Sequence, residues 1–327
     1  MIPEKLKEGD EIRIIAPARS INLPFISEEV RILAKKRLEN MGLAVSFGKH
    51  IFEKNNFDSS SIIHRIEDLH EAFANPKIKM ILTVIGGFNS NELLPYIDYD
   101  LIKKNPKILC GYSDITALEN GIYAMTGLTT YSGPHFFDFG EKIGFDYTMD
   151  YFKRALFSAK NYEIIASEKW SCDLWANIQQ NRNFHNNTGH YVLNEGKAEG
   201  ILIGGNLVTL HSLLGSPYFP DIKNSILFLE EDEEENKFSF NRNLTSLTLL
   251  NDFKYVNGLI LGRFNPKSEI NKKELDEIIA NNPKLKNIPI IGGLDFGHTT
   301  PRLTLPIGGK VKLESLKDQI VISINNH

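Results

Sequence analysis

The sequence predicts an α/β protein with a mainly parallel sheet in its first half and a second α/β domain after it. Short apolar runs alternate with amphipathic segments, which is the pattern of strands joined by right-handed crossover helices. The chain has 327 residues, more than one small core usually accommodates. The alternation stops between about residues 160 and 195. We therefore expect an N-terminal domain over 1–165, an interdomain loop over 166–195 and a C-terminal domain over 196–327.

In the first half, four apolar runs are expected to form strands and three amphipathic segments to form helices. The strands are 11–16, 43–47, 79–85 and 107–110. The helices run from about Ser27 to a stop at Gly42, from 61 to 73 and from 114 to 125. Because ligands of such sheets bind beyond the carboxyl ends of the strands, we expect the site there.

The second half repeats the alternation. Expected strands are 197–203, 225–229, 258–261 and 288–291, and expected helices are 207–214, 240–250 and 272–279. The tail over 303–324 is expected to form short strands around a Gly308-Gly309 turn. The irregular region before this half contains Trp170 and Trp175, which argues against simple disorder.

Composition excludes several classes of protein. Hydrophobic residues make up 42% and charged residues 24%, as in ordinary globular proteins, and the net charge of −4 does not favour nucleic acid. No stretch approaches the ~20 apolar residues of a membrane span, and the charged N-terminus does not resemble a secretory signal. Two cysteines form neither a disulfide framework nor a four-ligand zinc site. We expect a reduced, cytoplasmic protein that requires no metal and no cofactor.

The first candidate for chemistry is Ser113, in the segment Gly111-Tyr-Ser113-Asp114 between an apolar strand and a helix. A serine at this junction presents its hydroxyl at the carboxyl edge of the sheet, beside the free N–H groups of the helix. This is the logic of a nucleophile elbow, although the sequence is not G-x-S-x-G. The alternative is that Ser113 or Asp114 only caps the helix, and either role fits this segment by itself.

The second and third candidates also follow strands. Glu230 comes directly after the apolar run 226–229, whereas the other five residues of the acidic run 230–235 are expected to form a solvated face. His298 lies in a Gly/Thr/Pro loop after the strand at 288–291. Taken singly, each is also explained as a surface residue. Their order and their shared position at strand ends favour a catalytic Ser…Glu…His set, with His135 as a pocket residue and competing base.

Motifs along nearly the whole chain resemble those of the LD-carboxypeptidase family of serine peptidases. They are Gly9-Asp10, Ile85-Gly86-Gly87, Gly111-Tyr-Ser113-Asp114, Gly204-Gly-Asn-Leu207, Leu227-Phe-Leu-Glu230 and Gly297-His-Thr-Thr-Pro301. The stretches 86–90, 94–98 and 170–175 are most similar to the branch that contains the microcin C self-immunity proteins. The resemblance implies a flavodoxin- or Rossmann-like N-terminal domain, a C-terminal α/β domain and a homodimer.

The resemblance also implies roles for individual residues. Ser113 matches the nucleophile, His298 the base and Glu230 the residue that orients the histidine. The family's oxyanion hole is formed by the backbone N–H after the serine, here that of Asp114, and by one N–H of the glycine pair. Gly87 is favoured for the second donor, with Gly86 as the alternative.

The expected reaction is amide hydrolysis through an acyl-enzyme, on aminoacyl- or peptidyl-nucleotides resembling microcin C. Trp175 is expected to stack on the base, a contact worth about 1–3 kcal/mol, with Gly86, Asn206 and His135 as further substrate-binding residues. Both tryptophans are otherwise explained as anchors of the loop. The alternative enzyme is a murein tetrapeptide LD-carboxypeptidase, and the alternative of another class is a non-catalytic protein that binds a nucleotide or peptide.

Overall fold

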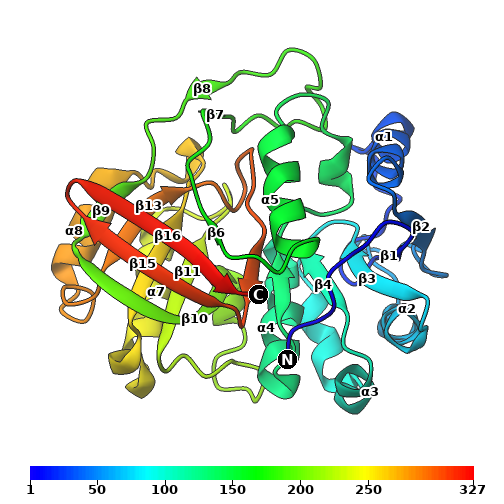
Figure 1. Cartoon of the computed structure of the whole chain (residues 1–327), viewed down its shortest axis with the longest axis horizontal. Coiled ribbons are helices and arrows are strands. Elements are labelled where there is room, and N and C mark those ends of the chain that lie inside the picture. The colour runs from blue at the N-terminus through cyan, green and yellow to red at the C-terminus, as the bar shows by residue number, and fades with distance from the viewer.

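Two sheets organise the chain, and the computed structural model describes all of it, residues 1–327 (Figure 1). The predicted α/β fold class is confirmed. The first sheet has the order β14-β5-β4-β3-β1-β2. Neighbouring strands are parallel except that β14 runs antiparallel to β5. The strands are β1 (Glu11–Ile15), β2 (Ala44–Phe47), β3 (Ile78–Thr83), β4 (Ile108–Gly111), β5 (Thr130–Ser132) and β14 (Leu305–Ile307).

The helices of the first half connect and cover these strands. They are α1 (Glu28–Glu39), α2 (Ile62–Ala74), α3 (Tyr99–Lys104), α4 (Thr116–Thr126) and α5 (Asp146–Leu156). The hydroxyls of Ser27 and Ser61 cap α1 and α2 by accepting from free N–H groups of the first turn. α4 packs on β4 and β5 and also contacts β10 and α6 of the second half, so it lies between the two sheets.

The second sheet has the order β6-β16-β15-β10-β11-β12-β13-β9. Its centre, β10 to β13, is parallel, and the outer strands are antiparallel to their neighbours. The strands are β6 (Tyr162–Glu163), β9 (Tyr191–Asn194), β10 (Gly196–Asn206), β11 (Ser225–Glu230), β12 (Gly258–Gly262), β13 (Ile290–Leu294), β15 (Lys310–Leu316) and β16 (Gln319–Asn326). Helices α6 (Leu207–His211), α7 (Lys237–Leu249) and α8 (Lys272–Asn281) join the parallel strands.

The region between the halves is more ordered than its sequence indicates. β7 (Lys169–Trp170) and β8 (His185–Asn186) pair with each other, and β9 pairs with β13 at the edge of the second sheet. Strands of two to four residues are too short to show a period of two, which explains why the pattern suggested only a loop.

One strand crosses between the halves of the chain. β14 comes from the C-terminal tail, yet it forms the edge of the first sheet through antiparallel pairing with β5. β15 and β16, which follow it, return to the second sheet. The tail is therefore shared by both sheets.

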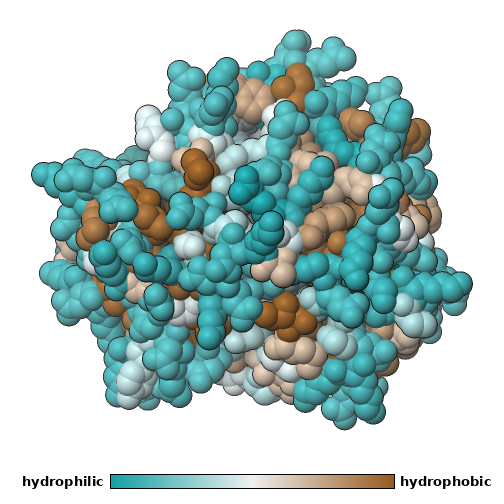
Figure 2. Space-filling view, viewed as in Figure 1, coloured by the Kyte–Doolittle hydropathy of each residue, from teal (hydrophilic) through white to brown (hydrophobic).

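The buried apolar side chains of the two sheets form one contiguous cluster, which contains Ile12 and Met80 of the first sheet and Leu227 and Ile291 of the second. A second cluster lies on the α2 side of the first sheet, around Leu69 and Phe73. Figure 2 shows a mainly hydrophilic surface with scattered apolar patches on the face viewed. None of the helices combines the length and apolarity needed to cross a bilayer.

Candidate active site

Ser113 lies at the carboxyl end of β4, separated from the strand only by Tyr112. Its φ is +60°, in the left-handed region that residues with a side chain rarely adopt. Such a backbone costs about 1–3 kcal/mol and is typical of catalytic turns. The short turn η2 (Ser113–Ile115) leads into α4, whose first residues receive no side-chain cap from Ser113 or Asp114. The geometry is that of a nucleophile elbow rather than of a helix cap.

Three side chains from distant parts of the chain meet at this turn. Nε2 of His298 lies 3.0 Å from Oγ of Ser113, and Nδ1 of His298 lies 2.7 Å from Oε2 of Glu230. Glu230 is the last residue of β11, and His298 lies in the loop after β13. The predicted Ser…Glu…His set is thus one connected chain of hydrogen bonds. Such a chain can carry a proton from a serine hydroxyl to an imidazole.

Burial and charge both act on the hydrogen bonds between Ser113, His298 and Glu230. Glu230 is only 2% exposed, and its other oxygen, Oε1, has no hydrogen-bond partner in the protein. Burial is the largest influence on His298 and disfavours its charged form, but the charge and hydrogen bond of Glu230 outweigh it and raise the pKa of His298. The carboxylate is therefore positioned to stabilise a protonated imidazole.

The loop that carries His298 is held from both sides. Nε of Arg302 donates to the carbonyl of Gly297 at 2.8 Å, and NH1 donates to the buried carboxylate of Asp138 at 3.0 Å. Gly297 has a φ of +98°, and a Cβ there would lie 2.5 Å from Oε2 of Glu230, so only glycine fits. Thr300 donates to Glu141 at 2.7 Å. These contacts hold the imidazole where Ser113 and Glu230 meet it.

The glycine pair lies against the nucleophile. A Cβ on Gly86 would lie 2.9 Å from Cβ of Ser113 and 3.4 Å from the backbone N of Asp114. The carbonyl of Gly86 accepts from Nε of Arg19 at 3.2 Å. In a trans peptide the next N–H points away from that carbonyl, so the N–H of Gly87 is directed away from Arg19. Of the pair, Gly87 lines the cavity at Ser113, whereas Gly86, which was predicted to bind substrate, is buried and does not line it.

Asp114 connects the turn at Ser113 to the loop that follows the glycine pair. Its Oδ2 accepts from the backbone N–H groups of Asn89 and Ser90, at 3.1 and 2.9 Å, and its carbonyl accepts from the hydroxyl of Ser90. The loop after the glycine pair is therefore bonded to the residue after the nucleophile. This keeps the backbone of Gly87 and Asp114 in a fixed relation.

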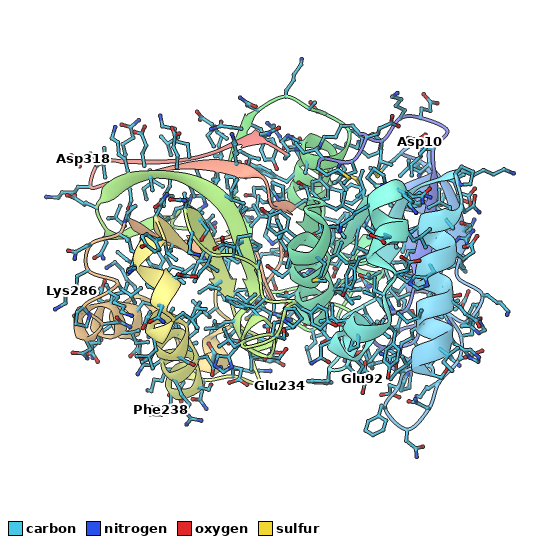
Figure 3. All side chains as sticks on the ribbon, turned by 90° about the horizontal axis from the view of Figure 1, so that it is seen from below. Asp10, Glu92, Glu234, Phe238, Lys286 and Asp318 are labelled. Atoms are coloured by element: carbon cyan, nitrogen blue, oxygen red, sulfur yellow. The ribbon has the colours of Figure 1, made fainter.

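A cavity of about 400 Å³ opens above Ser113 and His298. Its lining combines aromatic and apolar side chains with acidic ones. The apolar residues include Phe25, Phe88, Phe137, Leu174 and Trp175, and the acidic ones include Asp173, Asp232, Glu233 and Glu234. In Figure 3 Glu234 lies near the junction of the two halves of the molecule. The volume lies within the range typical of small-molecule binding sites.

The two tryptophans have different surroundings. Trp175 lines the cavity and packs partly against the main core. Trp170 does not line the cavity; its ring lies 5.0 Å from the guanidinium of Arg263 and 4.9 Å from the ring of His185. Of the two, Trp175 alone is positioned to touch a ligand there, and Trp170 has the contacts of an anchor.

The other predicted substrate-binding residues, His135 and Asn206, differ in whether they line the cavity. His135 lines the cavity, but it is 2% exposed, its Nδ1 lies 2.8 Å from Oγ1 of Thr83, and burial keeps its pKa well below the usual value. Asn206 does not line the cavity: its side chain caps α6 by accepting from Thr209 and donates to Glu231 at 3.3 Å. A neutral, enclosed His135 is not hydrogen-bonded to the serine.

Glu231 corrects the expectation of a solvated acidic face. It is 1% exposed, and burial, followed by the charge of Glu230, raises its pKa to about 9, so it is a neutral acid at pH 7. Arg19 and Arg302 also line the cavity, although neither was predicted to be a site residue. A signal for Arg302 was present, since it is a lone cation four residues after His298.

Comparison with known proteins places the chain in a family. Residues 12–133 match the LD-carboxypeptidase N-terminal domain, and residues 199–313 match the LD-carboxypeptidase C-terminal domain. The chain is 48% identical to YocD of Bacillus subtilis over 100% of both chains, and 37% identical to the microcin C7 self-immunity protein MccF of Escherichia coli over 85% of this chain and 83% of MccF. It is 27% identical to a murein tetrapeptide carboxypeptidase of Pseudomonas aeruginosa over 93% of this chain and 92% of that protein.

Solved structures agree with this placement. An MccF-like protein of Bacillus anthracis superposes with a TM-score of 0.98 at 49% identity over 100% of both chains. MccF in complex with aspartyl sulfamoyl adenosine superposes with a TM-score of 0.88 at 34% identity over 100% of this chain and 99% of that one. Both the sequence and the whole fold thus match proteins near MccF. The chain belongs to the LD-carboxypeptidase family, close to the branch that contains MccF, and this membership indicates a hydrolase of the carboxypeptidase type.

Proposed function

We propose that the protein is a serine carboxypeptidase in which Ser113 is the nucleophile, His298 the general base and Glu230 the residue that orients the base. The observation that carries this proposal is the continuous hydrogen-bond chain from Oγ of Ser113 through both nitrogens of His298 to Oε2 of Glu230. A protein that only binds its ligand has no need of this chain. The left-handed backbone of Ser113 supports the same conclusion, since strain of that kind is characteristic of reactive turns.

The reaction proceeds through an acyl-enzyme. His298 takes the proton of Ser113 as Oγ attacks the carbonyl of the scissile amide, and then gives it to the departing nitrogen. Water attacks the ester in the second half, with His298 again acting as base. Glu230 keeps the proton of the resting imidazole on Nδ1, so that the lone pair of Nε2 faces the serine.

The oxyanion of each tetrahedral intermediate is held by the backbone N–H groups of Gly87 and Asp114. Two features support this pair: Gly87 lines the cavity at Ser113, and Asp114 is bonded to the loop that follows the glycines. One such donor typically lowers the activation barrier by about 3–4 kcal/mol. Neither donor requires a metal or cofactor.

The proposed substrates are aminoacyl- or peptidyl-nucleotides. Trp175 supplies an aromatic face in the cavity wall, and MccF, a close structural relative, is known in complex with aspartyl sulfamoyl adenosine. Four acidic residues of the lining, Asp173, Asp232, Glu233 and Glu234, suit the ammonium group that an aminoacyl substrate carries one carbon from its scissile carbonyl. A murein tetrapeptide is the second candidate, because a murein tetrapeptide carboxypeptidase is among the relatives.

Turnover measured on both substrate classes tests the proposal. Wild-type protein is expected to hydrolyse an aminoacyl-sulfamoyl adenosine faster than a murein tetrapeptide. Ser113→Ala is expected to reduce the turnover of both substrates by a factor of ~10⁴ or more. A serine-directed phosphonate should label Ser113. No labelling and no turnover of either substrate would indicate a binding protein, whereas faster turnover of the tetrapeptide would assign the murein activity.

Trp175→Ala tests the nucleotide part separately. Loss of stacking should raise KM for the adenosine substrate about five- to a hundredfold, the range that ~1–3 kcal/mol implies. Trp170→Ala is the matched control, because that ring lies outside the cavity. Equal KM values for the two variants would remove the support from stacking. The homodimer and the cytoplasmic location stay predictions, and light scattering of the purified protein tests the first.

A further inference from the structure

A cluster of two histidines and a carboxylate lies at the outer edge of the first sheet. His50 and Glu53 are in the turn after β2, and His64 is in the first turn of α2. Nδ1 of His50 lies 2.7 Å from Oε1 of Glu53, and Nδ1 of His64 lies 2.6 Å from Oε2 of the same carboxylate. The two imidazoles are stacked, with ring centres 4.0 Å apart and planes inclined by 12°. One carboxylate therefore faces two parallel rings.

The far side of His50 is occupied as well. Its Nε2 lies 2.9 Å from Oε2 of Glu67, and the residue is only 6% exposed. When Glu67 accepts the proton on Nε2, the lone pair of Nδ1 faces the carboxylate of Glu53. Two electron-rich atoms at 2.7 Å need a positive charge between them, either a proton or a cation. A carboxylate on the distal nitrogen is also the usual support of a metal-binding histidine.

We propose that His50, Glu53 and His64 bind a divalent transition metal of the zinc class. The three ligand atoms lie within 4.8 Å of one another, and the two nitrogens and one carboxylate match a three-ligand zinc site that leaves a position for water. Bonds of about 2.0–2.2 Å place the ligands of a tetrahedral ion roughly 3.3 Å apart. Metal binding therefore requires the half-exposed side chains of Glu53 and His64 to move, and the His64 ring to turn from its stacked position so that its lone pair meets the ion. Imidazole ligands favour Zn²⁺, Ni²⁺ or Cu²⁺ over Ca²⁺ and Mg²⁺.

The cluster is separate from the proposed active site. β2 is the edge strand, and β1 and β3 lie between it and β4, which leads to Ser113. His50 borders a hollow of about 1170 Å³ that shares no residue with the cavity above Ser113. The metal is therefore not a participant in the hydrolysis.

The position of the proposed metal site indicates that a bound metal would stabilise the fold. The ligands connect the turn after β2 to α2, and the carbonyl of Ile51 in that turn accepts from Oγ of Ser20 and the N–H of Ile21, at 3.0 and 3.1 Å. A bound metal would cross-link these segments in the folded state only. It should therefore raise the melting temperature without being needed for turnover.

Titration of tag-free, chelator-treated, full-length protein with ZnCl₂ and NiCl₂ tests the proposal. Calorimetry should show one saturable site per chain, and zinc at a hundred times Kd should raise Tm by ~4–8 °C. Co²⁺ should give the visible absorption of a four- or five-coordinate ion. Hydrolytic turnover should be unchanged by the chelator treatment.

Variants identify the ligands. His64→Ala and Glu53→Gln should each weaken zinc binding by tenfold or more, and Glu67→Gln, which removes the support of His50, by about 10–100-fold. His185→Ala is the matched control, because His185 is an exposed histidine outside the cluster. Turnover should stay at the wild-type level in all four. The absence of saturable binding by wild-type protein, or equal binding by His64→Ala, Glu53→Gln and His185→Ala, would overturn the proposal.

Discussion

Replacement of Glu230 by glutamine is the most informative single change, because it removes one charge from a buried side chain. The amide has two possible orientations. With its oxygen toward Nδ1 of His298, its NH₂ group would take the place of Oε1, which has no partner in the protein. Leaving a buried donor unpaired costs about 1–3 kcal/mol. The opposite orientation is therefore favoured, with the NH₂ group donating to Nδ1.

That orientation reverses the imidazole. A proton accepted by the lone pair of Nδ1 requires the ring's own proton to be on Nε2, which then cannot accept from Ser113 at 3.0 Å. We expect the plateau of kcat/KM to fall by ~10³–10⁴, or about 4–5.5 kcal/mol in the barrier. Loss of the negative charge also removes what holds the pKa of His298 above its usual value. The acidic limb of the pH profile should accordingly move to lower pH.

The assay is the pH dependence of kcat/KM from about pH 5 to 9, measured on an aminoacyl-sulfamoyl adenosine. Glu231→Gln is the matched control, since Glu231 is the adjacent buried residue, is uncharged at pH 7 and makes no contact with His298. Its plateau should stay within about threefold of wild type. A Glu230→Gln plateau within tenfold of wild type, or an unshifted acidic limb, would refute the assigned role of Glu230.

Three further predictions follow from the same region. The pKa of Glu231 is raised to about 9, so the folded protein retains a proton that the unfolded chain releases near pH 4.5. The free energy of unfolding should therefore fall as pH rises between these two values. Glu231→Gln should flatten the dependence of Tm on pH over that range. Arg302→Ala leaves the buried carboxylate of Asp138 unpaired and should lower the free energy of unfolding by about 3–5 kcal/mol in urea titrations, whereas a loss below 1 kcal/mol would show that the pair is unimportant. Gly86→Ala places a methyl group 2.9 Å from Cβ of Ser113 and should reduce kcat by tenfold or more with little change in Tm; unaltered kcat would show that the nucleophile has room to move.

The sequence was sufficient for features determined by local patterns. Apolar runs predicted the parallel strands of both sheets except β5 (Thr130–Ser132), because buried strands are usually continuous in hydrophobicity and Thr130-Tyr-Ser132 is not. Ser113, Glu230 and His298 were found because each directly follows or lies just beyond such a run. The carboxyl ends of β11 and β13 lie at the same edge of the second sheet, so Glu230 and His298 could be expected to converge. Ser113 follows β4 of the first sheet, and no local pattern indicated that the two sheets bring these strand ends together.

Features that depend on distant contacts could not be predicted. Residues Leu305–Ile307 form only a three-residue strand that contains a proline, and nothing local indicates that β5 is their partner. Glu231 is buried like Glu230, whereas the four acidic residues after it are partly or fully exposed, and its partner Asn206 lies 25 positions away in the sequence. Asn206 belongs to a family motif, yet its side chain is used to cap α6.

The crossing of β14 makes the two halves of the chain interdependent. A polypeptide that ended near residue 180 would contain Ser113 but lack the strand that completes its own sheet beside β5. The remaining polypeptide would contain Glu230, His298 and that strand, with no β5 to receive it. Two such fragments would have to associate before either sheet or the proton-transfer chain was whole. Turnover by a mixture of the two fragments would therefore report that they have associated.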